Sequence, residues 1–154
     1  MSKVIKCRIR IEAPEIEEYF NRIINDDKTM LEVQNKFAQF CNEFVPMQEG
    51  VLSQSITVTP QYVQYNAPYA HYMYVGEVYG PNIPIKDSDG NIEGWFSPPG
   101  QKKHPTGRQM QFNTEKHPRA SKEWDKAMMD SERGDEFCEA VKEILVRRAK
   151  ELYG

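Results

Sequence analysis

The apolar residues of this chain recur with two different periods, and the order of these periods constrains the fold more than any other feature. In residues 29–44 they return every three or four positions, which is the spacing of an amphipathic helix. In residues 55–65 they alternate with polar residues, as strands do. A helical stripe returns in residues 121–152. This order predicts an α+β fold, with helices on both sides of a β region.

The N-terminal part predicts one strand and two helices. Residues 4–11 alternate between aliphatic and basic side chains, so we expect a half-buried antiparallel strand there. Pro14 is a favourable first residue for a short helix. Thr29 and Glu32 have the spacing of a capping box, which predicts the start of a second helix, and Pro46 should end that helix.

The middle of the chain carries turn signals. Two alternating stretches on either side of Pro60 predict a hairpin, and residues 69–79 predict a short turn of helix that leads into another strand. Residues 80–118 hold six of the ten prolines, so we expect a long irregular excursion. Within it, Asp89 followed by Gly90 predicts the tight turn of a protruding hairpin.

The C-terminal third predicts a pair of helices. Ser121 is expected to cap a first helix that contains Trp124, and Gly134 is expected to separate it from a longer amphipathic helix. The length of 154 residues is that of one ordinary domain, so we expect residues 1–154 to form a single domain.

Composition argues against several broad classes of protein. The chain has 20 basic and 23 acidic residues, a formal net charge of -3, which gives no global attraction to nucleic acid. No apolar run approaches the roughly 20 residues needed to cross a bilayer. Cys7, Cys41 and Cys138 each lie within an apolar pattern, so we expect three buried thiols in a reducing compartment.

Motifs for catalysis and ion binding are weak. Residues 87–91 begin like a calcium loop, but the glycine is fourth instead of sixth and the twelfth position is Pro98, so we favour a polar hairpin tip. No phosphate-binding glycine motif and no hydrolase nucleophile motif occurs, and the three histidines lack metal-ligand spacing. We therefore expect no catalytic residue, cofactor or metal. An enzyme with a site around His71 and His117 stays open as a minor hypothesis.

Two features are candidates for contacts with a partner. Between residues 101 and 122 there are six basic residues and one acidic residue, a cluster that could follow a phosphate backbone or meet an acidic patch on a neighbouring subunit. Six tyrosines fall within residues 62–79, and both core packing and partner contact remain open for them. The predicted interface residues are Tyr69, Tyr72, Tyr74, Tyr79, Trp95, Phe96, Lys102, Lys103 and Arg108.

Three motifs, in this order and spacing, carry a resemblance to a known family. They are Val45-Pro46 with Gly50, Leu52 and Ser55, then Tyr69-Ala70 with Val75-Gly76-Glu77, then His117-Pro118-Arg119-Ala120 with Trp124. Together with the C-terminal amphipathic helix, they resemble the minor capsid or neck proteins of tailed bacteriophages, of the head-to-tail connector and tail-completion type. The similarity extends from about Phe44 to the C-terminus.

The resemblance implies helices packed on a curved antiparallel β-sheet, a long protruding loop or hairpin at about residues 80–118, and a C-terminal helix. It also implies a virion protein, assembled in the host cytoplasm, that forms a homo-oligomeric ring with neck, portal-adaptor or tail proteins as partners, and that can be monomeric in isolation. It supplies no catalytic residues. The alternative hypothesis is a small nucleic-acid-binding module that uses the basic loop at residues 102–122.

Overall fold

The computed structural model describes residues 5–10, 14–46, 55–81 and 83–153, and these form helices and short antiparallel strands. The elements in chain order are α1 (Pro14–Ile24), α2 (Asp27–Asn42), β1 (Ile56–Val58), β2 (Val63–Tyr65), α4 (Ala70–Val75), β3 (Glu77–Gly80), β4 (Ile83–Lys86), β5 (Ile92–Phe96), β6 (His104–Gln109), α5 (Trp124–Asp130) and α6 (Glu132–Tyr153). The predicted α+β class is confirmed.

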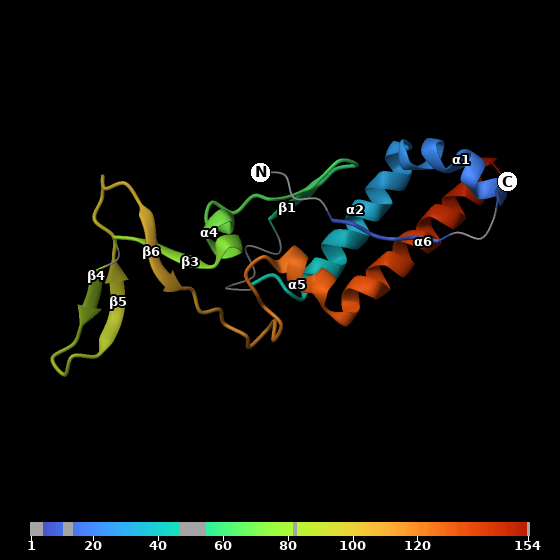
Figure 1. Cartoon of the computed structure of the whole chain (residues 1–154). Coiled ribbons are helices and arrows are strands. Elements are labelled where there is room, and N and C mark those ends of the chain that lie inside the picture. Colours follow the sequence, from blue (N-terminus) through green and yellow to red (C-terminus); the bar gives the residue numbers. More distant parts are fainter. Residues whose placement is uncertain (1–4, 11–13, 47–54, 82, 154) are drawn as a thin grey trace.

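The molecule is elongated, with helices α1, α2, α5 and α6 towards one end, strands β3 to β6 towards the other, and the β1–β2 hairpin beside α2 (Figure 1). Helices α1, α2, α5 and α6 form the body, in which α6 packs against each of the other three. Strands β3 to β6 extend away from the body, and we call the described residues of 77–109 the arm. Helix α4 lies where the arm leaves the body.

The strands pair only antiparallel, but they do not form the single curved sheet that the family resemblance implied. In the part of the chain that the structure describes, they form separate two-stranded ribbons, β1 with β2, β3 with β6, and β4 with β5. Each strand has only three to six residues, and β4–β5 is inserted between the two strands of the β3–β6 ribbon. The expectation of helices packed on one sheet is therefore wrong. The helices of the body pack mainly on one another.

The core lies between the amphipathic faces of α2, α5 and α6. Trp124 and Met128 of α5 and Phe137 and Leu145 of α6 are buried there, and Ile23 of α1 is also fully buried. These residues come from the helical stripes that the sequence shows. Because burying a large apolar side chain stabilises by about 1.5–3 kcal/mol, this layer holds the four helices together.

The N-terminal segment 5–10 is extended but is not the predicted strand. Its odd-numbered side chains are half-buried and its even-numbered ones are exposed, as the alternation predicts. Ile5, Cys7 and Ile9 pack against the core, but the described segment pairs with no strand. Alternation reports which side chains face an apolar surface, and here that surface is made of helices.

Cysteine pairing also differs from the expectation. Cys7 and Cys138 form a disulfide, with their Cα atoms 5.5 Å apart, so the prediction of buried thiols is wrong for these two residues. Cys41 is a buried thiol, as predicted, and burial raises its pKa. The disulfide ties the N-terminal segment to α6 across 131 positions of sequence.

The helix starts differ in detail from the predicted caps. Asp26, and not Thr29, is the N-cap of α2, and its carboxylate accepts a hydrogen bond of 2.9 Å from the main-chain N of Thr29. The N-cap of α5 is Glu123 instead of Ser121. The break between α5 and α6 falls at Ser131, and Gly134 is buried inside α6. Short polar residues near a helix start compete for the cap, so the spacing alone did not select the right one.

The local hairpins follow the predictions. Strands β1 and β2 form the hairpin around Pro60, α4 leads directly into β3, and β4 and β5 flank the turn at Asp89 and Gly90. Strand β6 lies in the stretch that we expected to be irregular. The sequence did not predict β6 because prolines interrupt the alternating pattern of a strand.

Candidate interaction surfaces

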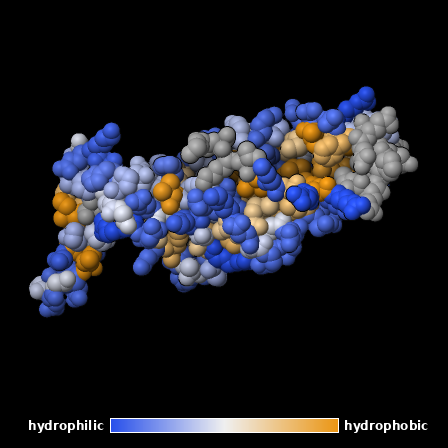
Figure 2. All heavy atoms as spheres, viewed as in Figure 1, coloured by the Kyte–Doolittle hydropathy of each residue, from blue (hydrophilic) through white to orange (hydrophobic). Residues whose placement is uncertain are grey.

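The hairpin β4–β5 carries a cluster of exposed large apolar side chains, which we call the arm patch. Its members are Ile83, Ile85, Ile92, Trp95 and Phe96, each 48–52% exposed. Figure 2 shows hydrophobic side chains on the outer part of the arm. Exposed apolar clusters are typical of sites that contact another molecule, so the arm patch is a candidate interaction surface.

The register of β4 and β5 explains why the arm patch is exposed. Ile83 lies opposite Phe96, and the neighbouring pair is Pro84 with Trp95. Successive pairs along a ribbon point to opposite faces, so both faces of this hairpin carry apolar groups. A core strand would have a second layer over such a face. In the described part of the chain this ribbon belongs to no larger sheet, and the guanidinium of Arg108 lies over the ring of Trp95.

The arm is joined to the body by a rigid connection. Gly76 ends α4 with φ of 72°, and a Cβ atom there would lie 2.5 Å from Cβ of Lys122. Main-chain bonds then fix the chain on both sides, from Met110 N to Gly76 O at 2.8 Å and from Glu123 N to Tyr74 O at 2.8 Å. The side chain of Glu77 accepts a hydrogen bond of 2.8 Å from the main-chain N of Gly107. These bonds fix the direction in which the arm leaves the body.

The tip of the β4–β5 hairpin is polar, as predicted. The carboxylate of Asp87 accepts hydrogen bonds from the main-chain N of Asp89 at 2.9 Å and of Asn91 at 2.8 Å. These bonds, with that from Asn91 the largest cause, lower the pKa of Asp87. Gly90 adopts φ of 85°, which glycine tolerates without strain. The carboxylate of Asp87 is thus used to close the turn.

The predicted basic residues divide between two places. Lys102, Lys103 and Arg108 are exposed on the arm, and the guanidinium of Arg108 lies 4.6 Å from the ring centroid of Trp95. Arg119 instead lies on the body and pairs with Glu132 at 2.6 Å. Arg119 is thus engaged with α6, whereas Arg108 and Lys103 of the arm adjoin aromatic residues.

The predicted tyrosines also divide. The rings of Tyr72 and Tyr79 pack edge to face, with centroids 4.9 Å apart, at the start of the arm. Lys103 lies 5.9 Å from the ring of Tyr72, and Tyr69 is exposed at the N-cap of α4. The structure thus brings three of the predicted interface tyrosines to the place where the arm joins the body.

Tyr74 faces the body. Its ring packs edge-on against Trp124, with centroids 4.9 Å apart, and its hydroxyl donates a hydrogen bond of 2.6 Å to Asp125. Burial and this bond raise the pKa of Tyr74. Tyr65 also packs edge-on against Trp124, with ring centroids 5.1 Å apart, and burial raises the pKa of Tyr65 as well. Core packing accounts for these two phenols.

His71 and His117, the two histidines of the enzyme hypothesis, both make structural contacts. The Nδ1 atom of His117 lies 2.7 Å from the main-chain O of Val45, which holds the loop before α5 against the end of α2. His71 is exposed on α4, and its ring contacts Tyr72. Among the described residues, neither imidazole hydrogen-bonds to a carboxylate.

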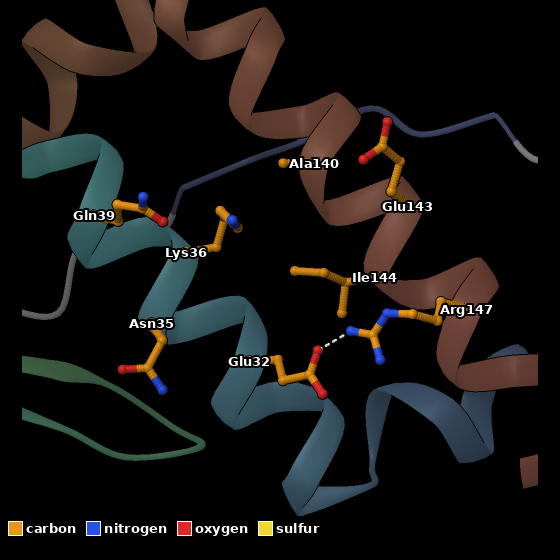
Figure 3. A pocket seen from close by; sticks show the side chains of 8 residues that line it. All are labelled: Glu32, Asn35, Lys36, Gln39, Ala140, Glu143, Ile144 and Arg147. Carbon is orange, nitrogen blue, oxygen red and sulfur yellow. Dashed lines mark hydrogen bonds and ion pairs between the residues drawn. The ribbon is translucent and has the colours of Figure 1, made fainter. Parts of the chain in front are cut away.

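A surface pocket lies between α2 and α6, away from the arm (Figure 3). Its lining residues are Glu32, Asn35, Lys36, Gln39, Ala140, Glu143, Ile144 and Arg147. Arg147 of α6 forms an ion pair with Glu32 of α2 across the pocket, and a second one with Glu151 at 3.0 Å. The pocket is thus bridged by a contact that joins two helices of the body.

Sequence reasoning missed the three isoleucines of the arm patch. The signal was present, because Ile83 and Ile85 alternate before the Asp89-Gly90 turn and Ile92 follows it.

Within the described residues, no group of three or more His, Cys, Asp and Glu side chains could hold a metal ion, and no helix is long and apolar enough to cross a membrane.

A comparison with protein families gives one match. The family model described as minor capsid protein matches residues 7–143, which include the arm and the body up to the middle of α6. No curated protein and no solved structure matches the chain significantly. Since the match spans most of the 154 residues, the chain belongs to the minor capsid protein family and is a structural protein of a phage virion.

Proposed function

We propose that this protein is a neck subunit of a tailed phage, which forms a ring and joins the head to the tail or completes the tail. The observation that carries the proposal is the arm, whose apolar residues lie on both faces of a ribbon and remain exposed. A subunit that contacts neighbours on two sides needs such a projection. Family membership supports a structural role in the virion and does not point to catalysis.

The partners of this proposal are other neck, portal-adaptor or tail proteins, together with further copies of the same chain. Tyr69, Tyr72, Tyr79, Trp95 and Phe96 would supply rigid aromatic contacts. Lys102, Lys103 and Arg108 would meet acidic surfaces of the neighbours. A single contact of this kind buries little area, so the isolated chain can be monomeric until the ring closes.

The proposal is tested by removing the gene from the phage. A phage without this protein is expected to yield DNA-filled heads and separate tails, which electron microscopy of lysates distinguishes from joined particles. Supplying the unchanged protein from a plasmid should restore joined particles. Joined, tailed particles that form without the protein would contradict a neck role. Mass spectrometry of purified wild-type particles tests independently whether the protein is in the virion at all.

A further inference from the structure

The extended segment 5–10 has unpaired main-chain groups. Its odd-numbered side chains face the helices of the body, so its N–H and C=O groups point sideways along the surface of the body. No hydrogen bond joins the main chain of residues 5–9 to another described residue. The disulfide from Cys7 to Cys138 fixes this segment on α6. Residues 5–9 therefore have the form of a strand that is held in place with its edges unpaired.

Strand β2 presents a second unpaired edge. The main-chain N of Asn66 donates a hydrogen bond of 2.7 Å to the main-chain O of Ser55, which marks a bonded pair of the β1–β2 ladder. Bonded and non-bonded pairs alternate along an antiparallel ladder, so the main-chain groups of Tyr65 and Val63 point away from β1. Within the described residues, β2 pairs with β1 alone. The outer edge of β2 thus has no strand beside it in this part of the chain.

The two edges line one groove on the body. This groove has a volume of about 630 Å³ and is lined by Ile5 and Cys7 of the N-terminal segment and by Val63 and Tyr65 of β2. The helices contribute the apolar residues Val33, Phe37, Trp124, Phe137 and Val141 to its lining. An extended segment that lies in the groove can pair its main chain with a strand edge, while every second side chain meets an apolar surface.

The exposed side chains beside the groove are basic or uncharged. Lys6 and Arg8 lie on the exposed side of the N-terminal segment, and neither forms an ion pair with a described residue. Gln64 of β2 is exposed and uncharged. Asp125, the acidic residue of the lining, accepts a hydrogen bond from Tyr74. Side chains on one face of paired strands lie about 4.5–5.5 Å apart, so acidic side chains of an added strand would lie beside Lys6 and Arg8.

We infer that this groove binds an extended segment of a different virion protein by strand addition, and that apolar and acidic residues alternate in that segment. A second copy of this chain is not the source, because none of its described strands contains more than one acidic residue. The inference uses the role of the chain in the virion and not its place in the neck.

Peptide binding tests the inference on the isolated chain. The probe is a fluorescent peptide of about seven residues in which valine alternates with glutamate. Fluorescence anisotropy is expected to show saturable binding. A peptide with lysine in place of glutamate should bind about tenfold more weakly, because its charges would meet Lys6 and Arg8. The valine–glutamate peptide with a methyl group on every main-chain nitrogen should also bind about tenfold more weakly, since it cannot donate to a strand edge.

A charge reversal tests the acidic character of the partner. The variant with Lys6→Glu and Arg8→Glu is expected to prefer the valine–lysine peptide by about tenfold, the reverse of the wild type. The matched control carries Lys86→Glu and Lys102→Glu, which make the same change of net charge at exposed sites on the arm. The control should bind the valine–glutamate peptide as the wild type does. A wild type that binds both peptides equally would overturn the acidic partner.

Amide hydrogen exchange locates the bound peptide on the unsubstituted chain, so this measurement does not depend on the folding of a variant. The valine–glutamate peptide is expected to slow exchange about tenfold or more in residues 5–9 or 63–65, because unpaired N–H groups become hydrogen-bonded. Absence of binding would overturn the inference. Binding without slower exchange in either stretch would overturn strand addition.

Photo-cross-linking in purified particles identifies the source of the segment. A photoreactive benzoylphenylalanine in place of Gln64 lies beside the groove on its exposed side. The expected product joins this chain to another virion protein, at a segment with alternating apolar and acidic residues that mass spectrometry identifies. A product with a second copy alone, or no product, would overturn the assignment of the partner. Joined particles that form without this protein would contradict the neck role and leave the groove unaffected.

Discussion

The backbone of α6 passes close to the end of α5 at Gly134. A Cβ atom at this position would lie 2.1 Å from the main-chain O of Met129, well below the 3.0 Å that real Cβ atoms keep. The obstacle is backbone and not a flexible side chain, so it cannot rotate away. Gly134 therefore allows the sharp change of direction between α5 and α6, although the helix break itself falls at Ser131.

Gly134→Ala is expected to destabilise the protein by about 1–3 kcal/mol, the usual cost of overpacking. Alanine favours a helix interior by about 1 kcal/mol over glycine, but the clash with the carbonyl of Met129 outweighs this gain. Urea denaturation followed by circular dichroism measures the change. Gly94→Ala is the matched control, because the nearest atom to its Cβ is 4.0 Å away. A G134A protein as stable as the wild type would contradict the close approach.

At the scale of elements, the start of α2 is held by a residue from α6. Arg148 is buried, and it donates hydrogen bonds to Thr29 at 3.2 Å, to Asp26 at 3.1 Å and to Glu151 at 2.7 Å. Asp26 in turn caps α2. The buried charge of Arg148 is thus matched by two carboxylates, and the contact between α2 and α6 depends on their ionisation.

The pKa of Asp26 is lowered, first by the hydrogen bond from the hydroxyl of Thr29 and then by that from its main-chain N. A carboxyl with a lowered pKa in the folded state adds stability above the unfolded pKa of about 4, and loses it as the pH falls through the folded value. We expect Asp26→Asn to be less stable than the wild type at neutral pH. The difference should shrink as the pH falls below the unfolded pKa of about 4 and through the lowered pKa of the folded state.

Thermal melts at a series of pH values measure this difference. Thr29→Val removes the hydroxyl that is the largest cause of the lowered pKa, so the T29V protein should show a smaller acid-dependent loss than the wild type. Equal pH dependence in the wild type and the D26N variant would show that the carboxylate of Asp26 does not stabilise the helix pair.

At the scale of the whole molecule, the disulfide between Cys7 and Cys138 closes nearly the whole chain into one loop. The N-terminal segment packs three side chains on the helices but has no strand partner among the described residues, so this covalent bond is a main part of its attachment. Reduction releases the segment from α6 and frees conformational entropy in the unfolded chain.

The variant with both Cys7→Ser and Cys138→Ser is expected to lose about 2–5 kcal/mol of stability, the usual cost of removing a native disulfide. Adding a thiol reductant to the wild type should give the same loss, whereas adding it to the double variant should change nothing. Urea denaturation with and without reductant provides the measurement. Three reactive thiols per chain in the unfolded, unreduced protein would contradict the disulfide.

The prediction from sequence was accurate where a few neighbouring residues decide the structure. Asp89 with Gly90 predicted a hairpin, the Tyr69 region predicted a helical turn before a strand, and Pro14 opens α1. The prediction was inaccurate where a residue's contact partner is distant in the sequence. Asp26, the N-cap of α2, also accepts a hydrogen bond from Arg148, more than a hundred residues away, and nothing near Asp26 in the sequence indicates that contact.

For the candidate surfaces, too, the prediction was accurate where neighbouring residues decide and inaccurate where a distant partner decides. Trp95, Phe96, Lys102, Lys103 and Arg108 could be singled out because their stretch is rich in aromatic and basic residues, and the structure places them together on the arm. Tyr74 was singled out with the tyrosine-rich residues 62–79, yet it turns into the core, where its hydroxyl donates to Asp125, fifty-one positions later.

The sequence by itself determined the helical stripes, the local turns and the α+β class, because periodicity and turn residues act over a few positions. Only the tertiary structure decided that the strands form separate ribbons, that residues 5–10 lie on helices, that Cys7 meets Cys138, and that the apolar side chains of the arm patch stay exposed. These features depend on which surfaces meet in space. Many distant surfaces are equally apolar, so a linear pattern does not distinguish between them.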